Sequence, residues 1–163
     1  MRRVLVAVLA AMLLGLVGAG IGGIALAASS HGPSLEVSVL HASQSDAGGS
    51  IDPRLKDLPQ LTRDQPFVRY NVYKLLDRRS FPFDVGKPVT YGIVDGRTLQ
   101  VTLAATSVEK NEKRYQMAAQ IGEPGKEAFL KSLQVTASAN EPFFIGGQSY
   151  QGGTLFLELV VRP

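Results

Sequence analysis

The amino-acid sequence predicts an all-β protein: a single antiparallel β-sandwich of about eight strands, Ig-like or similar, with one short helix. Three observations predict this class. Short segments alternate apolar and polar residues with a period of two, and Gly, Pro, Asp and Asn separate these segments. Of the 163 residues, about 135 remain for one domain once an apolar leader is set aside. Two domains do not fit in that length.

The amino terminus has the pattern of a targeting segment. Two arginines follow Met1, and no charged residue occurs from 4 to 28. A small-x-small pattern ending at Ala27 is the type of site that signal peptidase requires. We therefore expect residues 1–27 to be a signal peptide and residues 28–163 to form the β-sandwich domain in the periplasm or outside the cell.

An uncleaved anchor is the alternative interpretation of the same leader. The 25 residues of the uncharged run are enough for a helix that crosses a bilayer, which needs about 20. In that case the domain would be anchored in the inner membrane and face the periplasm. Gly18, Gly20, Gly22 and Gly23 lower the hydrophobicity near its end and favour cleavage.

Composition excludes several classes of function. The segment after the leader has 15 Lys and Arg, because two of the 17 lie in the leader, against 14 Asp and Glu. Nucleic-acid binding needs a concentrated positive surface, and a formal charge of +1 does not indicate one. Cysteine is absent, so disulfides and thiolate nucleophiles or metal ligands are excluded.

The first half of the domain begins with an expected strand over 35–39, followed by a loop rich in Ser and Gly. Asp52 before Pro53 predicts the start of a short helix that ends at Pro59. A strand is expected over 67–76, with Val68, Tyr70, Val72 and Leu76 on one face and Phe67, Tyr73 and Leu75 on the other.

Two hairpins and two further strand regions follow in the second half. Asp95-Gly96 predicts a two-residue turn between strands over 89–94 and 97–107. A polar tip over 109–113 predicts a second hairpin with a strand over 114–121. The remaining expected strands are the segment with Phe129, Leu133, Val135 and Ala137 inward, the short strand 143–145, and the strand 154–161 with Leu155, Leu157, Leu159 and Val161 on one face.

No motif predicts catalysis, a metal site or a cofactor. The two histidines, His31 and His41, have no partner at triad or metal-ligand spacing, and no Ser lies in a Gly-x-Ser-x-Gly elbow. Dispersed carboxylates such as Asp77, Asp84 or Glu158 leave a small hydrolase as a minor alternative. That alternative needs two carboxylates about 5–10 Å apart in a cleft.

Two regions are candidate binding surfaces. Arg69, Lys74, Arg78 and Arg79 alternate with Tyr70 and Tyr73, so one strand can present a cationic and aromatic face to an acidic or carbohydrate ligand. The competing interpretation places Arg78 and Arg79 in a turn, with long cationic stems covering the sheet.

The second candidate surface is the loop that follows Phe143-Phe144-Ile145, where two Gly pairs flank Tyr150. Tyr150, with Gln148 beside it, can point outward as a contact residue. The glycines equally permit Tyr150 to fold back onto the edge of the sandwich. Both interpretations remain open from the sequence.

Three motifs resemble a group of uncharacterised exported proteins of Gram-negative bacteria. The motifs are Pro66-Phe67-x-x-Tyr70-x-x-Tyr73-Lys74-Leu75-Leu76, Asp95-Gly96-Arg97-x-Leu99-x-Val101 and Phe143-Phe144-Ile145-Gly146-Gly147-x-x-Tyr150-x-Gly152-Gly153. The likeness spans 39–161 and implies export and a shared β fold. It implies no activity, cofactor or ligand.

We therefore expect an exported, non-catalytic β-sandwich that acts in binding or in assembly of the cell envelope. Its partner is expected to be another envelope or extracellular protein, or a carbohydrate, with no nucleic acid. A membrane-tethered accessory subunit of an envelope complex is the main alternative.

Overall fold

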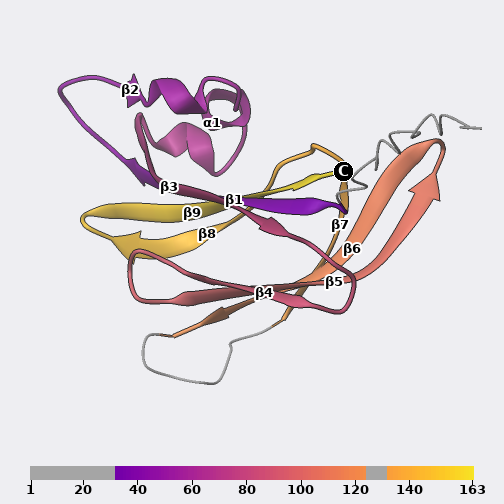
Figure 1. Ribbon diagram of the computed structural model, residues 1–163. Helices are drawn as coiled ribbons and strands as arrows, with labels where there is room; N and C mark the ends of the chain where they lie inside the picture. Colours follow the sequence, from indigo (N-terminus) through magenta and orange to yellow (C-terminus); the bar gives the residue numbers. More distant parts are fainter. Residues whose placement is uncertain (1–31, 124–131) are drawn as a thin grey trace, which may run out of the picture. The chain divides into compact units, whose positions relative to one another are not determined.

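The computed structural model of the protein describes residues 32–123 and 132–163, which form two β-sheets (Figure 1). Sheet A has the strand order β2-β3-β1-β9-β8, and sheet B has the order β4-β5-β6-β7. The strands are β1 Ser34–Ser43, β2 Ser50–Ile51, β3 Val72–Pro82, β4 Pro88–Gly92, β5 Thr98–Glu109, β6 Glu112–Gly122, β7 Leu133–Ser138, β8 Phe143–Tyr150 and β9 Gly153–Arg162. The mostly-β prediction is confirmed, with nine strands in the described residues. Sheet A is mixed rather than antiparallel, because β2 runs parallel to β3.

The short helical elements lie between β2 and β3. They are the 3-10 helices η1 (Pro53–Leu55) and η2 (Phe67–Arg69) and the α-helix α1 (Gln60–Arg63). The predicted cap is confirmed, because the Asp52 carboxylate accepts a hydrogen bond from the Arg54 amide at 3.0 Å. Pro59 precedes α1 instead of ending the helical region.

The predicted leader lies outside the described residues, as does Phe129. Within residues 32–123 and 132–163, no helix combines the length and the apolar character that a membrane span requires.

One apolar core joins the two sheets. From sheet A it takes the odd-numbered residues of β1 and β9, and from sheet B it takes alternate residues of β5 and β6. These residues include Leu35, Val37, Val39, Leu155, Leu157, Leu159 and Val161 from the first sheet and Leu99, Val101, Leu103, Tyr115, Met117 and Ala119 from the second. The alternation predicted for these strands is confirmed, and it places the two sheets face to face.

A second core lies on the opposite face of sheet A. There the covering segment, residues 50–70, packs its apolar side chains against Leu40, Ala42, Leu75 and Phe156. The residues contributed by the covering segment are Leu55, Leu58, Leu61 and Phe67, with Tyr70 at the margin. Strands β1 and β9 are therefore buried on both faces over much of their length.

The strand predicted over 67–76 is wrong in its first half. Phe67 lies in η2 and is 4% exposed, and β3 begins only at Val72. The Tyr73 hydroxyl donates to the Phe67 carbonyl at 2.7 Å, which ties the 3-10 turn to the strand. The apolar residues of this segment recur at intervals of three residues. In the second core they pack at that spacing, and not at the period of two that a strand would require.

Turn lengths also differ from the predictions. The Asp95-Gly96 hairpin is confirmed, but its loop has three residues: the Ile93 amide donates to the Arg97 carbonyl at 2.7 Å, and Gly96 has a φ of 85°. The strand predicted at 143–145 continues to Tyr150. The glycine-rich connection is thus largely part of the β8–β9 hairpin.

Gly146 is required by a close approach between two strands. Gly146 pairs with Phe156 across the β8–β9 hairpin, and a Cβ added at Gly146 would overlap ring carbons of Phe156. The Phe156 ring thus occupies the space that a side chain on Gly146 would fill, and both cores of sheet A depend on β9.

We predict that Gly146→Ala lowers the free energy of unfolding by about 1–3 kcal/mol, because the added methyl group displaces the Phe156 ring. Gly92→Ala is the matched control, since a Cβ there meets nothing within 4 Å. Urea unfolding of both variants measures the effect. Equal stabilities of the two variants would contradict the prediction.

Candidate binding site

Part of each predicted binding region lines a groove between η2 and β8, with Arg69 and Tyr70 from the first region and Gly146 and Gly147 from the second, whereas Tyr150 and Gln148 do not line it. We call this cavity the recognition groove; its volume is about 300 Å³. Its lining comes from the covering segment, β8 and β9, and consists of Pro66, Phe67, Arg69, Tyr70, Phe144, Gly146, Gly147, Thr154 and Phe156. Residues from the first and the third sequence motif therefore contribute to one surface, although about 75 positions separate them in the chain.

Aromatic rings form the walls of the recognition groove. The Phe67 ring lies 4.8 Å from that of Phe144 and 4.9 Å from that of Phe156, both distances between centroids. The Tyr70 ring is 5.8 Å from the Phe156 ring, and the Tyr70 hydroxyl donates to Thr154 Oγ1 at 3.0 Å. These contacts hold the walls in place, so an apolar guest would meet a surface that is already formed.

Arg69 places a positive charge at the recognition groove. It is exposed, and within residues 32–123 and 132–163 its guanidinium has no hydrogen bond or ion pair. Arg54 and Arg162, by contrast, are paired with carboxylates: Arg54 with Asp52 at 2.6 Å and Arg162 with Glu36 at 3.2 Å. The Arg69 charge is therefore available to an anionic group of a ligand.

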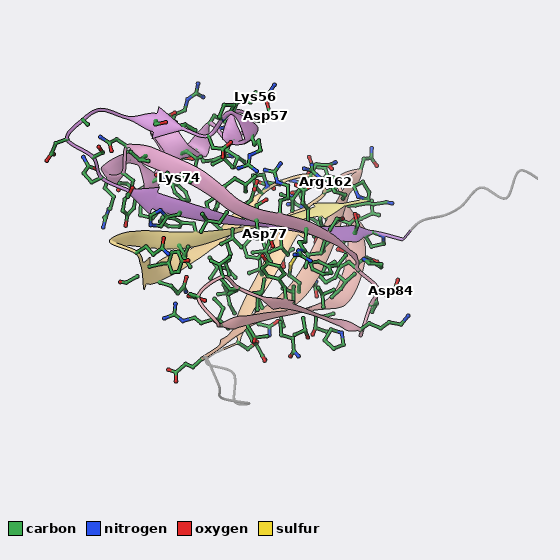
Figure 2. The ribbon with its side chains drawn as sticks, turned by 60° about the vertical axis from the view of Figure 1, so that its left-hand side comes forward. Lys56, Asp57, Lys74, Asp77, Asp84 and Arg162 are labelled. Atoms are coloured by element: carbon green, nitrogen blue, oxygen red, sulfur yellow. The ribbon has the colours of Figure 1, made fainter. Side chains whose placement is uncertain are left out.

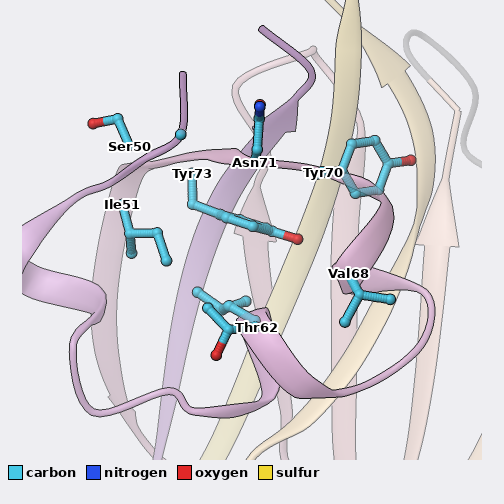
Figure 3. Close-up of a pocket in the computed structure, with 9 residues that line it drawn as sticks. Ser50, Ile51, Thr62, Val68, Tyr70, Asn71 and Tyr73 are labelled. Atoms are coloured by element: carbon cyan, nitrogen blue, oxygen red, sulfur yellow. The ribbon is translucent and has the colours of Figure 1, made fainter. Parts of the chain in front are cut away.

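A second pocket lies on the other side of Tyr70, with a volume of about 390 Å³ (Figure 3). The Tyr73 ring crosses it between Ile51 and Val68, with Thr62 nearby. Asn71 holds the neighbouring loop, because its amide donates to the Ser45 carbonyl and its oxygen accepts from the Ser45 amide, each at 2.8 Å. Tyr70 lines both cavities.

Tyr73 belongs to the core rather than to an exposed aromatic face. It is 2% exposed, and burial raises the pKa of its hydroxyl to about 12. The predicted continuous strand face of cations and tyrosines is therefore wrong, because Arg69 precedes the strand and Tyr73 points inward.

Arg78 and Arg79 lie within β3, not in a turn. The Arg79 side chain pairs with Asp77 at 3.2 Å. The Arg78 Nε donates to Ser38 Oγ at 3.0 Å on the outer face of sheet A, beside Glu158. Neither residue lines the recognition groove.

Tyr150 folds back toward the sheet. Its ring packs edge-on against His41 with centroids 5.9 Å apart, and its backbone carbonyl is 3.0 Å from His41 Nε2. Gln148 is half-buried beside the bulge in β8. His41 therefore has a partner in the described chain. The roles of Tyr150 and Gln148 in binding remain predictions.

The polar end of sheet A contains a buried carboxylate. In the sequence alone it is one of several dispersed acidic residues. Glu158 is 3% exposed and lines a pocket of about 200 Å³ together with Arg78, Arg162 and Asp57 (Figure 2 labels the last two). Its Oε2 lies 3.9 Å from an Arg78 nitrogen and has no hydrogen-bond partner.

Burial raises the pKa of the Glu158 carboxyl above its ordinary value. The Ser38 hydroxyl and the Arg78 charge act in the opposite direction, and the charge of Glu36 adds to the increase. Because the Glu158 Oε2 atom is buried, this network is part of the sheet and not an open site.

The acids named for a hydrolase do not share a pocket. Asp77 accepts from the Tyr91 hydroxyl at 2.7 Å and so links β3 to β4, Asp84 pairs with Lys87 at 2.9 Å, and Glu158 lines the pocket at the polar end of sheet A (Figure 2 labels the two aspartates). Among the described residues, no group of three or more His, Cys, Asp or Glu can hold a metal ion.

In comparisons with known proteins, the chain matches no family model, no curated protein and no solved structure.

We predict that Glu158→Gln changes how stability depends on pH. Because the folded pKa of Glu158 is raised, wild-type stability falls as pH increases from the unfolded pKa through the folded pKa, and the variant lacks this loss. The Tm of the variant relative to wild type should therefore rise as the pH increases above the ordinary carboxyl pKa. Glu112→Gln at an exposed hairpin tip controls for the lost charge. A relative Tm that falls with pH would show that the Arg78 pair outweighs burial.

Proposed function

We propose that this chain is an exported, non-catalytic β-sandwich of immunoglobulin-like or similar type that binds another envelope or extracellular protein. The observation that carries the proposal is the recognition groove, in which fixed aromatic walls lie beside the free charge of Arg69. A concave apolar surface with one charged group is suited to anchoring a side chain and orienting it.

The construction of the groove supports binding by a largely preformed surface. Phe67 and Phe156 belong to the second core and are 4% exposed each, while Phe144 packs at its margin. A guest therefore adds to an existing aromatic cluster without ordering the walls first, which lowers the entropic cost of association.

The export half of the proposal rests on the leader and makes a separate prediction. The intact mass of the protein recovered from fractionated host cells should correspond to a soluble chain that begins near Ala28. A full-length chain in the membrane fraction would instead support the tethered accessory subunit, in which the same groove would bind a neighbour in an envelope complex.

We predict that a photo-reactive amino acid in place of Arg69 cross-links one recurrent protein in the native host, because residue 69 lies at the groove. Arg63 is the matched control: it is an exposed arginine of the covering segment, in α1, outside the lining of the groove. Mass spectrometry of the adducts identifies the partner. The same adducts at both positions, or none at position 69, would contradict binding through the groove.

A further inference from the structure

β8 forms an edge of sheet A whose only protection among the described residues is a bulge at Gly147, where φ is 111°. No described strand pairs with its outer side, and its eight residues include no charged residue and no proline. Proteins commonly block exposed edges with charges, prolines or very short strands, since free backbone groups invite another strand. The other edge of sheet A, β2, has two residues, and β4 begins at Pro88.

β7 shares the lack of charge, but it does not line the recognition groove, whereas β8 does. Phe144, Gly146 and Gly147 of β8 line the recognition groove, so the open edge and the groove form one continuous surface. A strand paired with β8 would direct every second side chain toward the face that carries the groove.

We propose that an extended acidic segment of the partner protein adds to sheet A as a strand beside β8. One large apolar side chain of that segment enters the recognition groove, and an acidic side chain two positions away meets Arg69. This inference rests on the proposed function and specifies the partner's conformation and charge.

Charge complementarity selects this occupant over a second copy of the chain. β8 itself contributes no acid between Phe143 and Tyr150, so pairing of two β8 strands leaves both Arg69 charges without a partner from either strand. An acidic segment supplies that missing charge, and the aromatic walls accept its apolar neighbour.

The test uses synthetic peptides of about eight residues with alternating Thr and Val, one Phe, and one Asp two positions after it. Two derivatives carry N-methyl groups on the odd or on the even amides and keep every side chain. Because a paired strand directs only alternate amides toward its neighbour, exactly one derivative should bind about tenfold weaker or worse than the parent. Chemical-shift changes on titration should map to β8 and η2.

Two variants separate the contribution of the Arg69 charge from that of backbone pairing. Arg69→Glu should weaken the Asp peptide by about tenfold and weaken an Asn version of it less, whereas Arg63→Glu should change neither. Equal binding of both N-methyl derivatives would overturn strand addition and leave recognition by side chains in the groove.

The remaining outcomes also decide the question. Failure of the parent peptide to bind overturns the inference, while the proposed function is judged separately by the adduct at position 69. Self-association of the protein, with shifts in β8 and no need for peptide, would assign the edge to a second copy.

Discussion

Burial of β1 and β9 on both faces is the constraint from which the rest of the structure follows. Their inner residues meet sheet B, and their outer residues need a second cover that the two-sheet arrangement alone does not supply. The chain covers the apolar end of this outer face with residues 50–70. At the other end it places the network of Ser38, Arg78 and Glu158, where polar groups satisfy one another in part.

The recognition groove is a consequence of that second cover. Phe67 enters the outer core, and the Tyr73 hydroxyl holds its carbonyl, so the tight turn of η2 leaves Arg69 exposed two residues later. On the opposite wall, the Phe156 ring fills the space above Gly146 and packs against Phe67. The side chains that stabilise the covering segment are therefore the same ones that shape the groove.

The sequence predicts sheet B better than it predicts the covering segment. Leu99, Val101 and Leu103 alternate strictly because only one face of β5 is buried. Around Phe67 the apolar residues belong first to a 3-10 turn and then to a strand. An interpretation based on a period of two assigns both segments to one strand. The groove is harder to predict from the sequence. The sequence indicates Arg69 as a candidate binding residue, but the proximity of Arg69 to Phe144 depends on pairing between distant strands, which no local pattern encodes.

The uncharged edge of β8 has a packing cause over only part of its length. Phe143 and Ile145 contact the core between the sheets, and Phe144 contacts the outer core, so a charge at any of these would be buried beside apolar groups. Ser149 is exposed and carries no such restriction. A lysine there would block the edge at no cost to either core. Packing therefore does not account for the missing charge at Ser149, and this neutral position lies on the strand that borders the recognition groove.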